Sequence, residues 1–228
     1  MDTELWHWLD TAARDAATNM AIDEALLQGA DQRGAPLFRV YGWTRPSISI
    51  GYFQEYPADY EDDYAIVRRP TGGGLVWHGK DLTFTIVVPR AHALYRARGA
   101  ESYGAVHEML ARALNRAGIA CSLREAPSET AMGACFELPV PHDIMIDAKK
   151  IVGGAQRRTK FGLLHQGSLL LPPSQQRPIQ ELASAIRSGF GVRWQEVGLT
   201  ESEQHIADQL SHSKYFTVAW NRKFSAAA

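Results

Sequence analysis

Apolar and polar residues alternate along several segments in the middle of the chain, which is the pattern of half-buried β-strands. The clearest of these segments are residues 37–43 (LFRVYGW), 47–53 (SISIGYF) and 81–89 (DLTFTIVVP). A longer stretch, residues 141–172, has the pattern of a meander of strands with a turn at Asp147-Ala148. We therefore expect sheets built mainly from the central part of the chain.

Apolar residues recur at helical spacing in four other segments, residues 19–28, 102–117, 180–188 and 201–211. Asn19 is expected to cap the first of these helices, because asparagine is favoured at the N-terminal cap. Helices on either side of a central group of strands predict an α+β fold. We expect mixed or antiparallel central sheets flanked by helices.

The composition narrows the classes of function. Hydrophobic residues make up 45% of the chain and charged residues 21%, and the formal net charge of −1 gives no general attraction to nucleic acid or to anionic membranes. No apolar stretch reaches the roughly 18 residues of a transmembrane helix, and the N-terminal segment lacks the pattern of a signal peptide. We expect one domain spanning residues 1–228, located in the cytoplasm, with neither nucleic acid nor membrane as a partner.

Arg68 and Arg69 precede a run of three glycines, residues 72–74, and His78 follows it. Glycines let the backbone approach a ligand closely, and their amides can bind a phosphate or an oxyanion. The arginines could bind a phosphate or a carboxylate, and His78 could donate or accept a hydrogen bond. The spacing fits neither a Walker loop nor a dinucleotide-binding motif. From these residues alone, a tight hairpin with solvated arginines explains the pattern equally well.

Cys135 and Lys150 form a second group of candidates. A thiol on a loop becomes a nucleophile when a nearby cation lowers its pKa, and a lysine followed by Gly153 and Gly154 can point into a cleft. Taken singly, a free cysteine is more often a small buried residue, and a strand lysine is more often solvated. Cys121 lies in an apolar segment and is expected to be unreactive. The histidines have no metal-ligand spacing, so no metal site is expected.

Five segments together resemble one family, the lipoate–protein ligase A and octanoyltransferase family, which is related in fold to biotin–protein ligase. They occur in the order typical of that family. The resemblance implies the catalytic fold of the family, and it implies that the glycine run and Lys150 belong to the site. The segments are NMAIDEALL (19–27), FRVYGWTRPSISIGYFQ (38–54), RRPTGGGLVWH (68–78), KKIVGGAQRR (149–158) and HQGSLLL (165–171).

Within the family, the chain most resembles the cysteine-dependent octanoyl-[acyl-carrier-protein]:protein N-octanoyltransferases. Residues 68–73, 135–137 and 149–156 match their Arg-Arg-Pro-Thr-Gly-Gly, Cys-Phe-Asp/Glu and Lys-Lys-Val-Ala-Gly-Ser-Ala-Gln segments. The ATP-dependent ligases carry an Asp-x-Gly-Asn pattern that is missing here, and an accessory domain for which the C-terminal sequence is expected to be too short. Two departures keep the ligase as an alternative: Gly154 replaces the family's serine, and Gly74 is more typical of ligases.

The resemblance implies that Cys135 takes an octanoyl or lipoyl group from acyl carrier protein as a thioester, assisted by Lys150. A lysine of a lipoyl-domain protein, such as glycine-cleavage H protein or 2-oxoacid dehydrogenase E2, then accepts it. No cofactor is required for this reaction, whereas the alternative ligase would need ATP and Mg to form lipoyl-AMP. A non-catalytic binder of lipoyl domains or acyl groups is a second alternative. The expected substrate contacts are Arg45, Arg68, Arg69, Thr71, Gly72, Gly73, Gly74, His78, Gly153, Gly154 and Ala155, and the expected wall of the acyl tunnel is Tyr41, Trp43, Val76 and Leu164.

Overall fold

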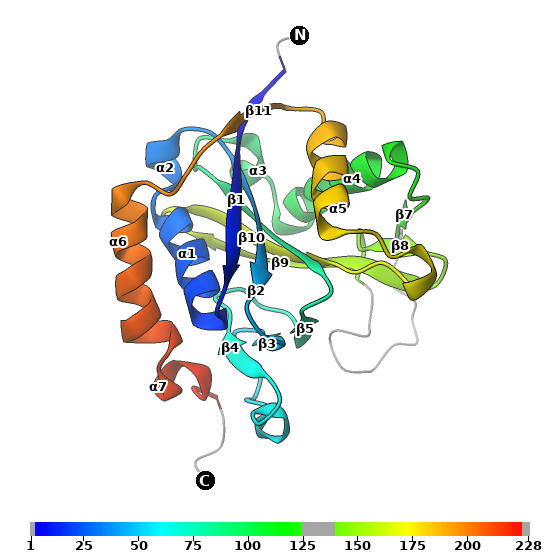
Figure 1. Ribbon diagram of the computed structural model, residues 1–228. Helices are drawn as coiled ribbons and strands as arrows, with labels where there is room; N and C mark the ends of the chain where they lie inside the picture. The colour runs from blue at the N-terminus through cyan, green and yellow to red at the C-terminus, as the bar shows by residue number, and fades with distance from the viewer. Residues whose placement is uncertain (1–2, 125–139, 225–228) are drawn as a thin grey trace.

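The computed structural model describes residues 3–124 and 140–224 of the chain. Its strands form an eight-stranded sheet, in the order β11-β1-β2-β6-β10-β9-β8-β7, and a three-stranded sheet, in the order β4-β3-β5 (Figure 1). In the large sheet β1 pairs in parallel with β2 and β11, and the other neighbours are antiparallel. The strands are β1 (Leu5–Arg14), β2 (Leu37–Trp43), β3 (Ser47–Ile50), β4 (Ala65–Arg68), β5 (Val76–His78), β6 (Leu82–Val88), β7 (Ser122–Leu123), β8 (Ile144–Ile146), β9 (Lys149–Thr159), β10 (Gly162–Leu169) and β11 (Arg193–Glu196).

Helices lie on both faces of the large sheet, which confirms the predicted α+β class (Figure 1). Helix α1 packs on one face with α6 against it, and α4 and α5 pack on the other face. The helices are α1 (Ala16–Gln28), α2 (Ala30–Arg33), α3 (Ala93–Arg96), α4 (Gly99–Arg116), α5 (Ile179–Gly189), α6 (Glu201–Leu210) and α7 (Val218–Asn221), with short 3-10 turns at Ala58–Tyr60 and Pro173–Gln175 and a π-helical turn at Ser211–Tyr215.

The alternation of side chains along β2 shows how the two hydrophobic cores are separated. Phe38 and Val40 point into the core under α4 and α5, whereas Leu37 and Tyr41 point into the core under α1. Successive side chains of a strand leave on opposite faces, so one buried strand supplies both cores. The ring of Phe38 stacks on that of Phe84, with the ring centroids 5.3 Å apart.

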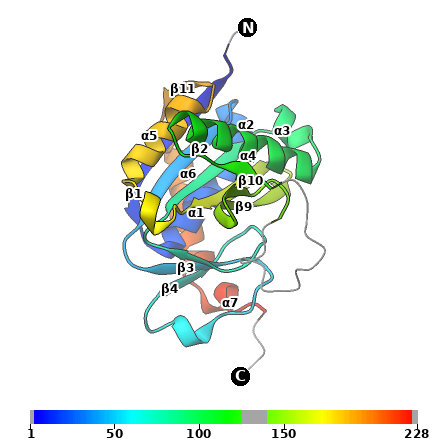
Figure 2. The same ribbon diagram turned by 90° about the vertical axis from the view of Figure 1, so that its right-hand side faces the viewer.

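The three-stranded sheet lies beneath the lower end of the large sheet in Figure 2, next to α1 and α7. Its strands β4 and β5 are joined by the segment that contains the glycine run 72–74. Both strands pair with β3 and not with each other, and Arg68 and Arg69 are buried, so the alternative of a tight hairpin with solvated arginines is wrong. The predicted turn at Asp147-Ala148 is confirmed, since it joins β8 to β9 and Asp147 has a φ of 51°. The glycine run is thereby brought next to the face of the large sheet that carries α1.

Two details of the secondary structure differ from the prediction. The N-terminal segment forms β1, a strand that the sequence analysis did not predict, although one half of the strand is apolar. Helix α1 begins earlier than expected, and Asp15 caps it by accepting a hydrogen bond from the amide of Thr18. The prediction that Asn19 is the cap is therefore wrong. The Asn19 side chain is buried inside the helix, where its Oδ1 accepts a hydrogen bond from Arg39 at 2.8 Å.

A buried ion pair explains why Asn19 is needed at that position. The guanidinium of Arg39 and the carboxylate of Asp23 lie 2.6 Å apart, and both side chains are fully buried. A buried ion pair is tolerated only when its remaining hydrogen-bonding groups are satisfied. Asn19 and Thr11 accept the other N–H groups of Arg39, and Gln166 and Thr85 donate to Asp23. This network lies directly under the pocket described next.

Candidate active site

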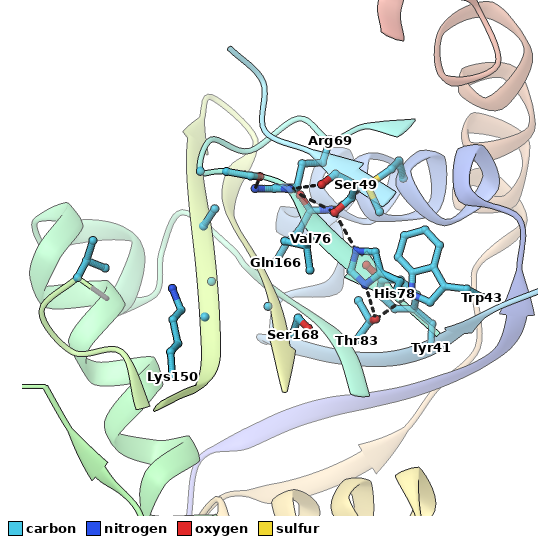
Figure 3. A pocket seen from close by; sticks show the side chains of 18 residues that line it. Tyr41, Trp43, Ser49, Arg69, Val76, His78, Thr83, Lys150, Gln166 and Ser168 are labelled. Carbon is cyan, nitrogen blue, oxygen red and sulfur yellow. Dashed lines mark hydrogen bonds between the residues drawn. The ribbon is translucent and has the colours of Figure 1, made fainter. Parts of the chain in front are cut away.

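A pocket of about 680 Å³, including the part open to solvent, lies between the large sheet and the three-stranded sheet (Figure 3). One row of paired residues forms its floor: Gly153 of β9 is opposite Ser168 of β10, which is opposite Thr83 of β6, which is opposite Tyr41 of β2. Since neighbouring strands are about 4.8 Å apart, this row extends roughly 14 Å across the sheet. The pocket therefore has the proportions for a linear chain lying across four strands.

Lys150 lies at the β9 end of the pocket (Figure 3). Its Nζ is 2.8 Å from Oδ2 of Asp143, whose side chain is fully buried. The lysine side chain folds over Gly153, where a Cβ would lie 2.3 Å from Cε of Lys150. Any side chain at Gly153 would thus displace the lysine, which is a physical reason for glycine at this predicted site position.

His78 lies toward the other end of the pocket and bonds through both ring nitrogens. Its Nε2 is 2.8 Å from Oγ of Ser49, and its Nδ1 is 2.8 Å from Oδ2 of Asp81. The indole of Trp43 stacks on the imidazole at a centroid distance of 4.1 Å. Burial acts to raise the pKa of Asp81, but His78 and two hydroxyl donors outweigh it and lower this pKa. The imidazole is therefore fixed in place rather than free to turn toward a ligand.

Arg69 holds the glycine run in shape from inside the fold. Its guanidinium donates to the carbonyl oxygens of Gly72, Gly74 and Ser49 and to Oγ of Ser49, at 2.7–3.2 Å. Gly73 has a φ of +86°, a conformation that other residues rarely adopt. Burial lowers the pKa of Arg69 to about 10, which leaves the guanidinium charged at neutral pH. The segment is consequently rigid, with Gly73 and Gly74 facing the pocket.

The other predicted contacts of this region lie outside the pocket lining. Arg68 is fully buried and donates to the carbonyl oxygens of Gly51, Tyr52 and Gln54 and of two residues of α7. Arg45 is exposed in the connection between β2 and β3. Thr71 is buried and donates from Oγ1 to Gln166, which does line the pocket.

Gly154 and Ala155, two further predicted contacts on β9, both line the pocket. Ala155 lines the pocket two residues beyond Gly153. A Cβ at Gly154 would lie 2.5 Å from Nε2 of His165, on the face of the sheet opposite the floor row. The serine of the family's pattern would therefore collide with His165 as this ring stands here. Of the four expected tunnel residues, Tyr41, Trp43 and Val76 line the pocket, whereas Leu164 packs in the core under α1.

Only one of the two cysteines, Cys121, lies within the described residues. Cys135 lies outside the described residues, so its predicted role as nucleophile stays a prediction. Cys121 packs against the core under α4, where burial raises the pKa of its thiol to about 11. Few such thiols are ionised at neutral pH, in agreement with the prediction that Cys121 is unreactive.

Several pocket residues were missed by the reasoning from sequence. Ser49 sits in the alternating segment before the glycine run, and Asp81, which lies behind the pocket lining, follows His78 by three positions. The hydroxyls of Thr83 and Ser168 donate to Asp81 at 2.8 and 2.7 Å. Gln166 belongs to a quoted segment, but nothing in the sequence showed that its side chain faces the pocket.

No helix in the described parts of the chain is both long and apolar enough to cross a bilayer. Within residues 3–124 and 140–224, no group of three or more histidine, cysteine, aspartate or glutamate side chains is arranged to hold a metal ion. Of the charged groups that line the pocket, Lys150 is paired with Asp143, whereas Arg69 donates to uncharged oxygen atoms of the fold.

The two sheets and the pocket between them, with Lys150 at one end, define a class of catalytic domain. The chain belongs to the family described as the lipoyl protein ligase A/B catalytic domain, whose model matches residues 15–191. This match confirms the family predicted from the sequence.

Curated relatives match along nearly the whole chain. The octanoyltransferase LipM of Carboxydothermus hydrogenoformans is 38% identical, over 97% of this chain and 100% of the relative. LipM of Kyrpidia tusciae is 30% identical, over 96% of this chain and 98% of the relative. A solved lipoate–protein ligase A bound with ATP superposes with a TM-score of 0.78 at 26% identity, covering 98% of this chain and 100% of that one. The two octanoyltransferase relatives confirm the prediction that this chain is a protein octanoyltransferase.

Proposed function

We propose that this protein transfers an octanoyl group from a carrier thioester to a lysine of a lipoyl-type protein, through a thioester on Cys135. The observation that carries the proposal is the pocket itself. It runs across four strands from the Lys150 end to Tyr41 and Trp43, and its lining is more apolar than polar. Burying each methylene is worth about 0.8 kcal/mol, so such a pocket binds a saturated chain well.

In the first step, the Cys135 thiolate attacks the carbonyl carbon of the octanoyl thioester. The bond from this carbon to the carrier sulfur breaks, and the carrier thiol leaves with a proton. Val140, five positions after Cys135 in the chain, lines the same pocket. The Lys150 ammonium would favour the thiolate.

In the second step, the neutral amine of the acceptor lysine attacks the acyl thioester. An amide bond forms, the bond to Cys135 breaks, and the lysine's proton passes to solvent or to the released thiolate. Backbone amides of the Gly73–Gly74 segment are candidates to stabilise the oxyanion, a contribution of about 3 kcal/mol for one such donor. Arg69 keeps this segment rigid, which supports such a role.

The partners follow from this chemistry. We propose acyl carrier protein as the octanoyl donor and the lysine-bearing lipoyl domain of glycine-cleavage H protein or of a 2-oxoacid dehydrogenase E2 as the acceptor. A solved bi-partite lipoate protein ligase from Thermoplasma acidophilum, described with its E2 lipoyl domain, has the same fold at a TM-score of 0.72 and 24% identity. We also propose that the protein works in the cytoplasm as one catalytic domain, without a cofactor.

A lipoate ligase that forms an acyl-adenylate is the second candidate, because a ligase bound with ATP superposes closely on this chain. The hydrogen bonds of the two motif arginines argue against it. The five N–H groups of Arg69 are all accounted for by oxygen atoms of the fold, and those of Arg68 point to main-chain carbonyls. In this arrangement Arg69 offers no donor to a phosphate, and Arg68 is fully buried away from the pocket.

The test is to incubate the protein with octanoyl-acyl carrier protein, without ATP, and to weigh the intact protein by mass spectrometry. We expect an octanoyl adduct on the wild type that disappears on adding an acceptor lipoyl domain. The Cys135→Ser variant should form no thioester adduct that hydroxylamine removes at neutral pH. Cys121→Ser is the matched control and should behave as the wild type, because the buried Cys121 thiol is a poor nucleophile.

Two outcomes would overturn the proposal. Modification of the acceptor by octanoate and ATP that survives Cys135→Ala would establish the ligase instead. Binding of the lipoyl domain with no modification under either condition would establish a non-catalytic binder.

A further inference from the structure

The lysine proposed for the reaction is held by groups that the sequence did not point to. We infer that Asp143 and Tyr103 are positioning residues that fix the Lys150 ammonium at the end of the pocket. The inference rests on the proposed role of Lys150. It names two further residues on which acyl transfer depends, neither of which lines the pocket.

Asp143 is placed to orient an ammonium group accurately. Its side chain is fully buried, and its Oδ2 lies 2.8 Å from Lys150 Nζ and accepts a second hydrogen bond from the amide of Val140 at 2.8 Å. Its main chain is fixed as well, because its carbonyl oxygen accepts from the amide of Arg124 at 3.0 Å. A carboxylate held this firmly leaves the ammonium little freedom to move.

Tyr103 of α4 supports the carboxylate from the other side. Its hydroxyl donates to Oδ1 of Asp143 at 2.6 Å and accepts from the amide of Gly154 at 3.2 Å. Burial, and then the neighbouring carboxylate, raise the pKa of Tyr103 far above its usual value, so the phenol keeps the proton it donates. Tyr103 thereby connects the Asp143 carboxylate to β9, the strand that carries Lys150.

Two histidines of the described residues, His107 and His142, also lie near this network. The His107 ring packs on Tyr103 at a centroid distance of 4.1 Å, and its Nδ1 bonds to the carbonyl oxygen of His142. Burial lowers the pKa of His107 to about 3, so the ring is neutral at the pH of activity. The His142 ring lies beside Gly104 of α4, where a Cβ would be 3.1 Å from it. His107 therefore adds no charge to the Asp143–Lys150 pair.

This geometry predicts a loss in the chemical step. Without the carboxylate, the Lys150 ammonium is held less firmly at the end of the pocket, so Asp143→Asn should lower kcat and leave the carrier KM nearly unchanged. Damage to folding alone would instead lower the fraction of folded protein, which circular dichroism measures directly.

The experiment measures single-turnover formation of the acyl-enzyme at neutral pH over a range of octanoyl-acyl carrier protein concentrations. We expect Asp143→Asn to react about tenfold slower or worse, with little change in the carrier KM. Tyr103→Phe should react about three- to tenfold slower with little change in carrier KM, which is the loss of roughly one hydrogen bond. Tyr95→Phe is the matched control, because its hydroxyl bonds to β9 at Thr159, away from Lys150.

The outcomes separate this inference from the proposed function. Wild-type rates in both variants, together with an inactive Lys150→Ala, would overturn the positioning role and leave the role of Lys150 intact. A fully active Lys150→Ala would instead overturn the proposed function. If Asp143→Asn does not fold, Tyr103→Phe tests the inference, because it removes one hydroxyl and keeps the ring. A rate equal to that of Tyr95→Phe would then overturn the inference.

Discussion

His78 Nε2 lies 2.8 Å from Ser49 Oγ, and this hydrogen bond joins the glycine run to the floor of the pocket. Arg69 carries only donors, so the Ser49 hydroxyl accepts from it at 3.2 Å, and Arg69 also binds the carbonyl oxygens of Gly72 and Gly74. On the other side of the imidazole, His78 Nδ1 lies 2.8 Å from Oδ2 of Asp81. A continuous chain of hydrogen bonds thus connects the glycine run to Asp81 beneath the pocket floor.

Asp81→Ala should be strongly destabilising. The carboxylate accepts from His78, Thr83, Ser168 and the amide of Gly79, and nearly all of it is buried. Removing one member of a buried, hydrogen-bonded charged group costs about 3–5 kcal/mol, because its partners lose their acceptor without regaining water. Urea unfolding of the variant gives this difference in the free energy of unfolding.

The control for this prediction is Asp31→Ala. Asp31 pairs with Arg90 at the surface, where the two side chains are 35% and 57% exposed. Exposed pairs contribute about 0–1 kcal/mol. Equal losses in the free energy of unfolding of the two variants would show that the Asp81 network contributes no more to stability than an exposed ion pair.

His107 should make the protein less stable in mild acid. Its pKa falls from 6.5 in the unfolded chain to about 3 in the folded protein, mainly because burial penalises the charged ring. Below pH 6.5 the unfolded state binds a proton that the folded state does not. The stability due to the neutral ring is therefore fully present above pH 6.5 and is lost as pH falls toward about 3.

The measurement is the free energy of unfolding as a function of pH in the wild type and in His107→Asn. The asparagine amide can still donate to the His142 carbonyl, but it does not titrate. We expect the slope between about pH 6 and pH 4 to decrease by up to about 1.4 kcal/mol per pH unit in the variant. His165 is buried with a lowered pKa as well, so part of the slope should remain. Identical slopes would contradict the prediction.

Gly154→Ser should be harmful here, although serine is the residue of the family's pattern. The new Cβ would lie 2.5 Å from Nε2 of His165, a ring nitrogen that has no hydrogen-bond partner in the described structure. Overpacking of this kind costs about 1–3 kcal/mol. Shortening the neighbour in Gly154→Ser/His165→Asn should recover part of that loss, as a coupling energy in a double-mutant cycle.

Gly72→Ser is the control for steric effects of serine, because a Cβ at Gly72 meets no atom within 4 Å. It should cost well under 1 kcal/mol, as open surface positions usually do. Additive effects of Gly154→Ser and His165→Asn would mean that the two positions are not coupled.

The local patterns of the sequence predicted the central strands well, because alternation reports directly which side chains a sheet buries. Strand β2 was predicted with its observed bounds, and β6 lies inside the predicted segment 81–89. Strand β1 and the role of Asn19 were missed because both depend on distant partners, β11 and Arg39. The same reason explains why only part of the site was predicted. The glycine run and Lys150 belong to recognisable motifs. No local pattern distinguishes Asp143 or Tyr103, because the fold brings them beside Lys150 from another loop and from helix α4.

Trp43→Ala should change which acyl chains are used. Trp43 closes the pocket end opposite Lys150, stacked on His78 and held by a hydrogen bond from Nε1 to Thr83 Oγ1 at 2.8 Å. Removing the indole lengthens the pocket, and each further methylene that becomes buried is worth about 0.8 kcal/mol, or roughly fourfold in kcat/KM. The ratio of decanoyl to octanoyl transfer, measured with the two acyl carriers in competition, should therefore rise by up to about fifteenfold for the two extra methylenes. Trp77→Ala should leave this ratio unchanged, because Trp77 is 48% exposed on β5 and does not line the pocket. An unchanged ratio in Trp43→Ala would mean that another residue limits the chain length.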